Sequence, residues 1–250
     1  MIRVTVWYEN MFHPQTQAAV KAMYPLGLPQ TIAAFLERDP QVAVRVVTMD
    51  QPACGLPDEV LDETDVLLWW SHSGYDLVPD EVARKVADRV LKGMGFIPLH
   101  SAHYAKPLRL LLGTSCTLRW READYERLWC VMPSHPIAAG LPVCIELPEE
   151  EMYGEFFDIP QPDELVFTGW FRGGELFRSG CCWYRGMGKV FYFQPGHETH
   201  AAYHNPYVQQ ILLNAVHWAA PTARREQLFF LHDDLGTDEL ARQGRPVPQY

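Results

Sequence analysis

Three short apolar runs of this sequence end in, or lead directly into, histidine. The histidines are His72 after 65–70, His100 and His103 after 96–99, and His197 after 190–193. Imidazole is the commonest metal ligand and titrates closest to neutral pH. With a carboxylate, these candidate metal ligands could hold a divalent ion, zinc or manganese, that polarises a carbonyl or hydroxyl group. Without a metal they could act as a general acid/base pair, and the residues alone leave both chemistries open.

Carboxylates are concentrated in the stretch 149–155, which reads Glu-Glu-Glu-Met-Tyr-Gly-Glu. Its composition favours a solvated acidic loop ahead of a turn. Met152 and Tyr153 are unfavourable when fully in water, so we expect that Glu151 or Glu155 points inward. The candidate catalytic residues are therefore His100, His197 and Glu155.

Aromatic and hydroxyl side chains accompany these positions. Tryptophans at 69, 70, 120 and 170 could line a sugar-stacking surface, although tryptophan is more often a core residue. No nucleotide cofactor is expected, because 93–95 lacks the third glycine and the following helix of a dinucleotide fingerprint, and 186–189 lacks the context of a P-loop. The candidate substrate-binding residues are Trp70, Ser101, Glu151 and Tyr153.

The surrounding elements should bring these residues to one edge of a sheet. Strands are predicted over 2–8, 42–49, 65–70 and 96–100, with helical stretches over 15–23, from Pro29 and from Pro79. This order predicts an α/β fold with a flavodoxin-like, doubly wound, mostly parallel sheet. Ligands of such sheets bind outside the carboxyl ends of the strands, so the four histidines are predicted to converge there.

The stretch 116–189 differs, because apolar pieces such as 127–132 and 165–171 are separated by Gly, Pro and acidic turns. We expect a mixed or antiparallel β insertion packed beside the main sheet. A core strand returns at 190–193, and an amphipathic helix over 207–218 follows it. The sequence thus predicts a single α/β domain over 1–220 and a C-terminal tail or arm over 221–250.

Bulk composition narrows the partners and the compartment. The 250-residue chain carries a net charge of −10, which argues against nucleic acid or an anionic membrane as partner. No signal-peptide pattern is seen and the six cysteines form no C-x-x-C pair, so we expect reduced cysteines and a cytoplasmic location. Many aromatic residues and few charges over 170–192 favour a homo-oligomer.

Several short motifs follow one another at fitting distances. They are Trp69-Trp70-Ser71-His72, Leu99-His100-Ser101-Ala102-His103, Gly113-Thr114-Ser115-Cys116, His135-Pro136-Ile137, Glu151-Met152-Tyr153-Gly154-Glu155, Gly174-Glu175 and Tyr192-Phe193-Gln194-Pro195-Gly196-His197-Glu198. From about Ile2 to Ala220 the chain resembles the ThuA (trehalose-utilisation) family of the class I glutamine-amidotransferase-like superfamily. The resemblance implies a flavodoxin-type fold and a setting in sugar catabolism, often beside sugar dehydrogenases.

The chain departs from true amidotransferases at the nucleophile. Their cysteine occupies a tight elbow after a core strand, where this sequence has His100-Ser101-Ala102, and Cys116 is too far along the chain to take that place. Without a thiolate there is no thioester route, so glutamine hydrolysis is not expected. His197 and Glu198 resemble the His and Glu that follow the last strand in that superfamily.

Three functions follow from these residues. The first is an enzyme acting on a sugar or keto-sugar, an isomerase, epimerase or hydrolase with the histidines lining its pocket. The second is a non-catalytic sugar-binding or accessory subunit. The third is a serine hydrolase, which requires Ser101 on a strained elbow within hydrogen-bond reach of His197.

Overall fold

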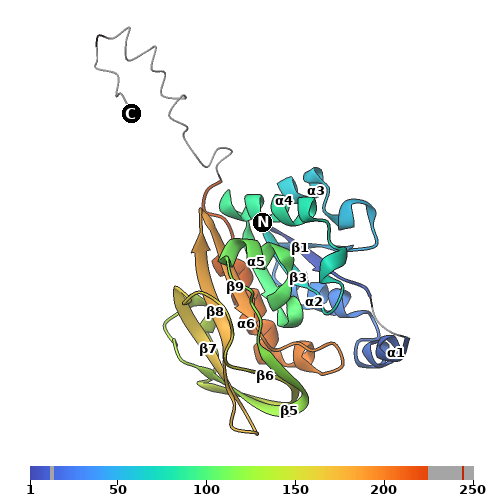
Figure 1. Cartoon of the computed structure of the whole chain (residues 1–250), viewed down its shortest axis with the longest axis vertical. Helices are drawn as coiled ribbons and strands as arrows, with labels where there is room; N and C mark the ends of the chain where they lie inside the picture. Colours follow the sequence, from blue (N-terminus) through green and yellow to red (C-terminus); the bar gives the residue numbers. More distant parts are fainter. Residues whose placement is uncertain (12–13, 225–243, 245–250) are drawn as a thin grey trace.

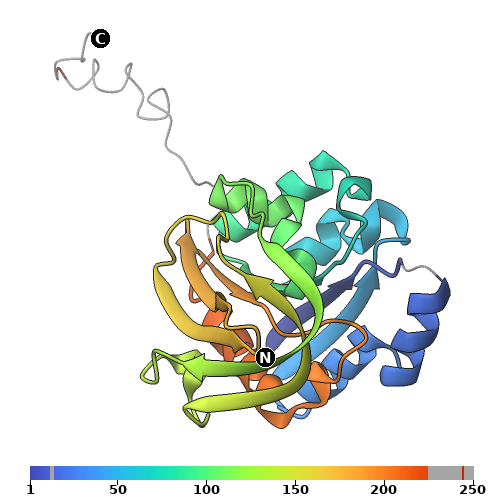
Figure 2. The ribbon, with the colours of Figure 1, turned by 60° about the horizontal axis from the view of Figure 1, so that its bottom comes forward.

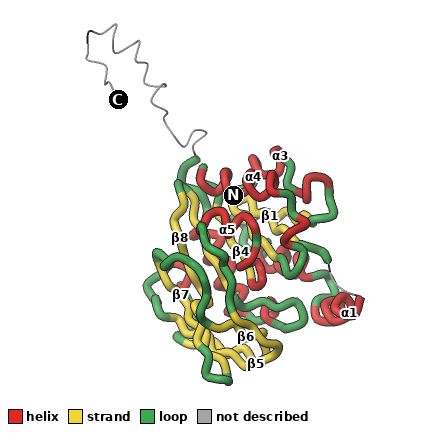
Figure 3. The backbone as a smooth tube through the Cα atoms, viewed as in Figure 1, coloured by secondary structure: helices red, strands yellow, loops and turns green. Residues whose placement is uncertain are grey.

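The computed structural model describes residues 1–11, 14–224 and 244, and the strands within them form one nine-stranded sheet of order β2-β1-β3-β4-β9-β8-β7-β5-β6 (Figure 3). The strands are β1 (Ile2–Tyr8), β2 (Val42–Thr48), β3 (Val66–Trp70), β4 (Gly95–Leu99), β5 (Arg119–Cys130), β6 (Cys144–Gly154), β7 (Glu164–Phe171), β8 (Leu176–Arg185) and β9 (Gly188–Phe193). All strands predicted over the first hundred residues are present, so the mixed α/β class is confirmed.

The first half of the sheet, β2-β1-β3-β4-β9, is parallel throughout. Every residue of β3 and β4 is buried, which explains why the sequence of β3 is apolar without alternation. Along β1 the side chains alternate between two cores, with Val6 facing one and Trp7 the other. Both faces of this half are therefore covered.

Helices supply the covering layers (Figure 1). They are α1 (Pro14–Met23), α2 (Leu28–Leu36), α3 (Asp58–Glu63), α4 (Asp80–Leu91), α5 (Lys106–Leu112) and α6 (Pro206–Ala219). One core packs α2 and α6 against the sheet, and the other packs α4 and α5 against the opposite face. Val82, Val86 and Val90 point into the second core, as their spacing of four residues predicts.

The second half, β9-β8-β7-β5-β6, is antiparallel throughout. The expected insertion is thus a direct extension of the main sheet and not a body packed beside it, because β8 is hydrogen-bonded to β9 along its length. The pairing of β5 with β6 shifts register twice near Asp124, and such irregularities bend a strand pair. Figure 2 shows these strands curving away from the parallel strands.

The acidic stretch at 149–155 is not a solvated loop, so that prediction was wrong. Residues 149–154 belong to β6, where Glu149 is exposed but Glu150 and Glu151 are buried. The backbone is held by pairing with β5, and the buried carboxylates have polar partners that the sequence does not reveal.

The predicted tail at 221–250 lies largely outside the described residues, which end, apart from residue 244, at Arg224. Arg224 donates hydrogen bonds to the Asp62 and Thr64 carbonyl groups and to the Asp65 carboxylate, and its distance to the Asp65 Oδ1 atom is 2.8 Å. Among the described residues, no helix is both long enough and apolar enough to traverse a lipid bilayer.

Candidate functional site

Three histidines meet at the carboxyl ends of β3, β4 and β9, which are neighbours in the centre of the sheet. His72 follows β3, His197 follows β9, and His100 begins a short 3₁₀ turn (His100–Tyr104) directly after β4. His100 has a φ of 51°, a left-handed conformation that an L-residue adopts only when its surroundings hold it there. A tight elbow therefore follows β4, and an imidazole occupies it.

The first pair of the site joins His100 to Glu151, which the curvature of β5 and β6 brings back to the end of β4. The His100 Nε2 atom lies 3.0 Å from the Glu151 Oε2 atom, and His100 Nδ1 donates to the Gln194 carbonyl oxygen at 2.8 Å. Burial alone lowers the pKa of His100, but the hydrogen bond and charge of Glu151 outweigh it and raise the pKa to about 9. Without a metal, the pair is thus imidazolium and carboxylate.

The second pair joins His72 to Glu198. His72 Nδ1 donates to the Glu198 Oε1 atom at 2.7 Å, and the Glu198 side chain is only 1% exposed. Burial lowers the pKa of His72, and the hydrogen bond and charge of Glu198 overcome this effect and raise it. The carboxylate therefore fixes the proton on Nδ1 and leaves Nε2 as the basic nitrogen of the ring.

His197 lies between the two pairs. Its ring centroid is 5.3 Å from that of His100 and 5.6 Å from that of His72. Its Nδ1 atom is 2.9 Å from the Thr199 hydroxyl and accepts the Thr199 N–H at 3.3 Å. Its buried Nε2 atom has no hydrogen-bond partner and lies 3.6 Å from the Glu198 Oε2 atom. Burial, reinforced by the charge of His100, lowers the pKa of His197 to about 4, so the ring is neutral.

The donor atoms fit a divalent metal ion. One ligand atom each from His100, Glu151 and His197 lies within 4.8 Å of the others, and a second such set is His72, His197 and Glu198. Metal-binding histidines usually donate their other N–H to a carbonyl or similar acceptor, as His100 does to Gln194. At His197 the Thr199 hydroxyl can accept that N–H, whereas the Thr199 N–H, 3.3 Å from the same Nδ1 atom, favours the other tautomer. Two imidazoles and one carboxylate form a ligand set of catalytic zinc sites, which keep a further position open.

A cavity of about 470 Å³ opens beside these pairs, a size typical of small-molecule sites. His72 and Glu151 line it, together with Trp120, whose side chain is 61% exposed, and no lysine or arginine is among its lining residues. Ser101 and Tyr153 also line it, with their hydroxyl oxygens 2.9 Å apart. The hydrogen bond of Ser101 thus goes to Tyr153 and not to His197, and the elbow residue is His100, which leaves the serine-hydrolase arrangement unformed.

Two predicted site residues are not part of the histidine cluster, and a third is buried behind it. His103 lines the cavity but donates its Nδ1 proton to the Cys116 carbonyl oxygen at 2.7 Å, outside both ligand sets. Glu155 is bound by Arg178 through two contacts of 2.8 Å. Trp70 is fully buried, because it belongs to a central strand covered on both faces. Its ring centroid lies 6.3 Å from that of His72 and its Nε1 atom donates to the Gly196 carbonyl oxygen, so it supports the cluster from behind and does not line the cavity.

A further cluster of His135, Glu164 and Cys182 has the spacing of a metal site but not its chemistry. The N–H of Ile137 points at His135 Nδ1 at 3.1 Å, so neutral His135 carries its proton on Nε2, facing Glu164 at 3.2 Å. His135 Nε2 and the Glu164 carboxylate thus satisfy each other, whereas the buried Nε2 atom of His197 has no hydrogen-bond partner. We interpret this cluster as a structural contact.

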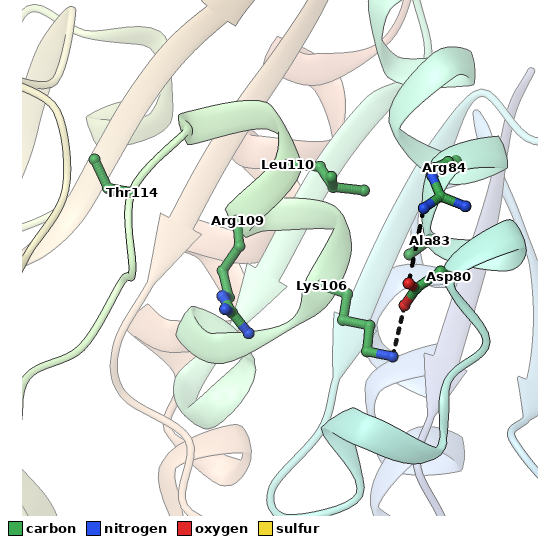
Figure 4. Close-up of a pocket in the computed structure, with 7 residues that line it drawn as sticks. All are labelled: Asp80, Ala83, Arg84, Lys106, Arg109, Leu110 and Thr114. Carbon is green, nitrogen blue, oxygen red and sulfur yellow. Dashed lines mark hydrogen bonds and ion pairs between the residues drawn. The ribbon is translucent and has the colours of Figure 1, made fainter.

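A second hollow, of about 330 Å³, lies between α4 and α5, away from the histidines (Figure 4). Its carboxylate, Asp80, faces both Lys106 at 2.8 Å and Arg84 at 3.7 Å, and Figure 4 shows these three side chains converging. Three basic side chains, Arg84, Lys106 and Arg109, line it with this one carboxylate, so the hollow is net positive and holds none of the histidines.

Sequence reasoning missed three carboxylates at the site. Glu198 was noted only within a motif, although it is the partner of His72. Glu9 and Glu150 are both buried and hold the loops of His72 and His197. Glu9 directly follows β1, so the search for polar residues at strand ends could have found it, whereas nothing in the sequence marks Glu150 as buried.

The fold and the site define an α/β protein with a histidine–carboxylate pocket at the carboxyl ends of parallel strands. The chain belongs to the ThuA family, described as trehalose utilisation, whose family model matches residues 3–219. A comparison with curated proteins gave no match.

Solved structures share the fold. A ThuA-like protein from Parabacteroides merdae is 15% identical with a TM-score of 0.66, over 91% of this chain and 92% of that chain. A ThuA-like protein from Bacteroides uniformis is 14% identical with a TM-score of 0.62, over 87% and 90%. A cytoplasmic protein from Salmonella typhimurium is 12% identical with a TM-score of 0.59, over 89% and 100%. At these identities the likeness establishes the fold alone.

Proposed function

We propose that this chain is an enzyme of trehalose or related disaccharide utilisation that acts on a sugar or keto-sugar with the help of a divalent metal ion. The observation that carries the proposal is His197, whose buried Nε2 atom lies between two His–carboxylate pairs. Neither this atom nor the Glu198 Oε2 atom 3.6 Å away has a hydrogen-bond partner. A buried polar atom left without a partner is costly, and a ligand at this point removes the cost.

His100, Glu151 and His197 are the residues that would hold the ion, zinc or manganese. Gln194 and Thr199 orient the two rings from behind, since they bind the Nδ1 atoms at 2.8 and 2.9 Å. When bound, such an ion polarises a carbonyl or hydroxyl oxygen of the substrate.

His72 and Glu198 are suited to move the proton. Glu198 holds the Nδ1 proton, so the Nε2 atom of His72 acts as base and returns the proton as acid. His72 also lines the cavity, where substrate hydroxyl groups would lie. Isomerisation, epimerisation and hydrolysis of a sugar all combine such proton transfer with polarisation of an oxygen.

The lining of the cavity favours an uncharged, hydroxyl-rich ligand. Glu122 and Glu151 repel phosphate groups, and the hydroxyl groups of Ser101 and Tyr153 can bond to those of a sugar. Trp120 offers a ring face for stacking. We expect Trp120→Ala to weaken trehalose or keto-trehalose binding about 5- to 30-fold, corresponding to about 1–2 kcal/mol, with thermal stability unchanged because the ring is mostly exposed. Equal affinity of both proteins would remove Trp120 from the site.

The same arrangement leads us to expect no glutaminase activity. Burial raises the pKa of the Cys116 thiol to about 11, so it is not a thiolate at neutral pH. We also infer a flavodoxin-like, doubly wound sheet, supported by helices on both faces. A cytoplasmic location is proposed because the six cysteines are unpaired.

Elemental analysis of protein purified without tag or chelator tests the proposal. We expect about one equivalent of a divalent ion per chain, lost in His197→Ala and retained in His217→Ala. His217 is a matched control because it is a partly exposed histidine that contacts Asp39 at 2.8 Å on the surface. Absence of metal, together with no thermal stabilisation on adding zinc or manganese, would overturn the metal-dependent mechanism.

Turnover is then followed by NMR with trehalose and its keto derivatives as substrates. Conversion by the metal-loaded protein, lost in His72→Ala, is the expected result. Tight binding without conversion would instead establish the non-catalytic sugar-binding subunit.

A further inference from the structure

We infer that two buried carboxylates, Glu9 and Glu150, are positioning residues that fix the loops of His72 and His197 relative to each other. The inference rests on the proposed function, because it treats these two loops as parts of one site. Neither carboxylate lines the cavity, so both act on the histidines from behind.

Glu9 holds the loop after β3. It follows β1, is 1% exposed, and its carboxylate accepts the N–H of His72 at 2.9 Å and that of Ser73 at 3.0 Å. The Ser73 hydroxyl adds a third bond at 3.3 Å. Two consecutive amides beside the metal-binding region are therefore fixed by one side chain from the neighbouring strand.

Glu150 holds the loop after β9 in the same way. It is fully buried, and it accepts the N–H of Gly196 at 2.9 Å and those of His197 and Glu151 at 3.0 Å each. One carboxylate thus ties the backbone of a proposed metal ligand on β6 to the backbone of another after β9.

The chemistry of these contacts requires a carboxylate. An ionised carboxylate accepts hydrogen bonds only, so every N–H of each loop meets an acceptor. A glutamine would turn an NH₂ group towards an N–H, leaving two buried donors facing each other.

The test compares Glu9→Gln and Glu150→Gln with Asp163→Asn in the full chain. Asp163 is the control, because its carboxylate also accepts a backbone N–H, that of Tyr184 at 2.7 Å. Tyr184 pairs with Lys189 near the start of β9, whereas His197 follows the other end of that strand. The first readout is the affinity for zinc and cobalt(II). We expect it to fall about 10- to 100-fold in the two glutamine variants and to stay unchanged in the control.

The second readout is the imidazole ¹⁵N spectrum of the metal-free protein with labelled histidine. Glu9→Gln should shift the signals of His72, and Glu150→Gln those of His197, while Asp163→Asn shifts neither. This readout does not depend on metal. If the wild-type protein binds no metal, the proposed function is overturned, but the spectra still test the positioning role.

Folded glutamine variants with the wild-type histidine spectrum would overturn the inference, as would an unchanged metal affinity. Where a glutamine variant does not fold, Glu9→Asp and Glu150→Asp replace it, because they keep the charge and shorten its reach. We then expect a smaller shift of the same histidine signals, and wild-type signals would again count against the role.

Discussion

Acidification should destabilise this protein through His103, and the replacement His103→Asn should remove that contribution. His103 donates its Nδ1 proton to the Cys116 carbonyl oxygen at 2.7 Å, and burial lowers its pKa to about 4 from 6.5. The folded state therefore favours the neutral ring. Its contribution to stability is complete above pH 6.5 and is lost as the pH falls from 6.5 towards 4.

The magnitude follows from this interval. It spans about 2.5 pH units, each worth about 1.4 kcal/mol per proton, so protonation of His103 lowers the free energy of unfolding by up to about 3 kcal/mol. His103 lines the cavity and is only partly buried, so this figure is an upper bound. Asparagine cannot be protonated, and its side-chain N–H can still donate to the Cys116 carbonyl group.

Urea denaturation of both proteins between pH 7.5 and 4.5, with a chelator present, measures the effect. We expect the wild type to lose stability faster than His103→Asn, so that the difference between their free energies of unfolding changes by up to about 3 kcal/mol in favour of the variant. His197, with a similarly lowered pKa, keeps part of the acid sensitivity in both proteins. Parallel pH profiles would refute the assignment to His103.

Two further predictions concern the loops and carboxylates of the site. Gly196→Ala should cost about 1–3 kcal/mol more than Gly113→Ala in urea denaturation, because both glycines have positive φ but only at Gly196 would a Cβ lie 2.2 Å from the Tyr203 hydroxyl. Equal losses would mean that the loop relaxes around the added methyl group. Glu151→Gln should abolish metal binding and Glu155→Gln should leave it intact, as measured by elemental analysis, and the reverse result would return Glu155 to the site.

Much of the parallel half could be predicted from sequence, because each strand there is encoded by a local apolar run. The same runs place His72, His100 and His197 at strand ends, and parallel strands bring such ends together without further information. The existence of the antiparallel strands was also expected, from turn residues and short apolar pieces.

The choice between Glu151 and Glu155 could not be made in this way. It depends on how far β6 curves back over the end of β4, and this curvature arises from register shifts near Asp124 that no local pattern encodes. Trp70 was misplaced for a related reason, since burial on both faces of a central strand is a property of the whole sheet. The homo-oligomer stays a prediction.

The division of the sheet into two halves has a consequence for folding. Several hydrogen bonds that assemble the site join residues far apart in sequence, for example Glu150 with Gly196 at 46 positions and His72 with Glu198 at 126. Contacts of such long sequence separation form late, after the entropy of closing the intervening chain has been overcome. The site therefore comes into existence only when the last strands have joined the sheet. A ligand bound there at 100 times its dissociation constant would add about 2.7 kcal/mol to that closed state. Recovery of ligand binding during refolding would therefore report when the last strands join the sheet.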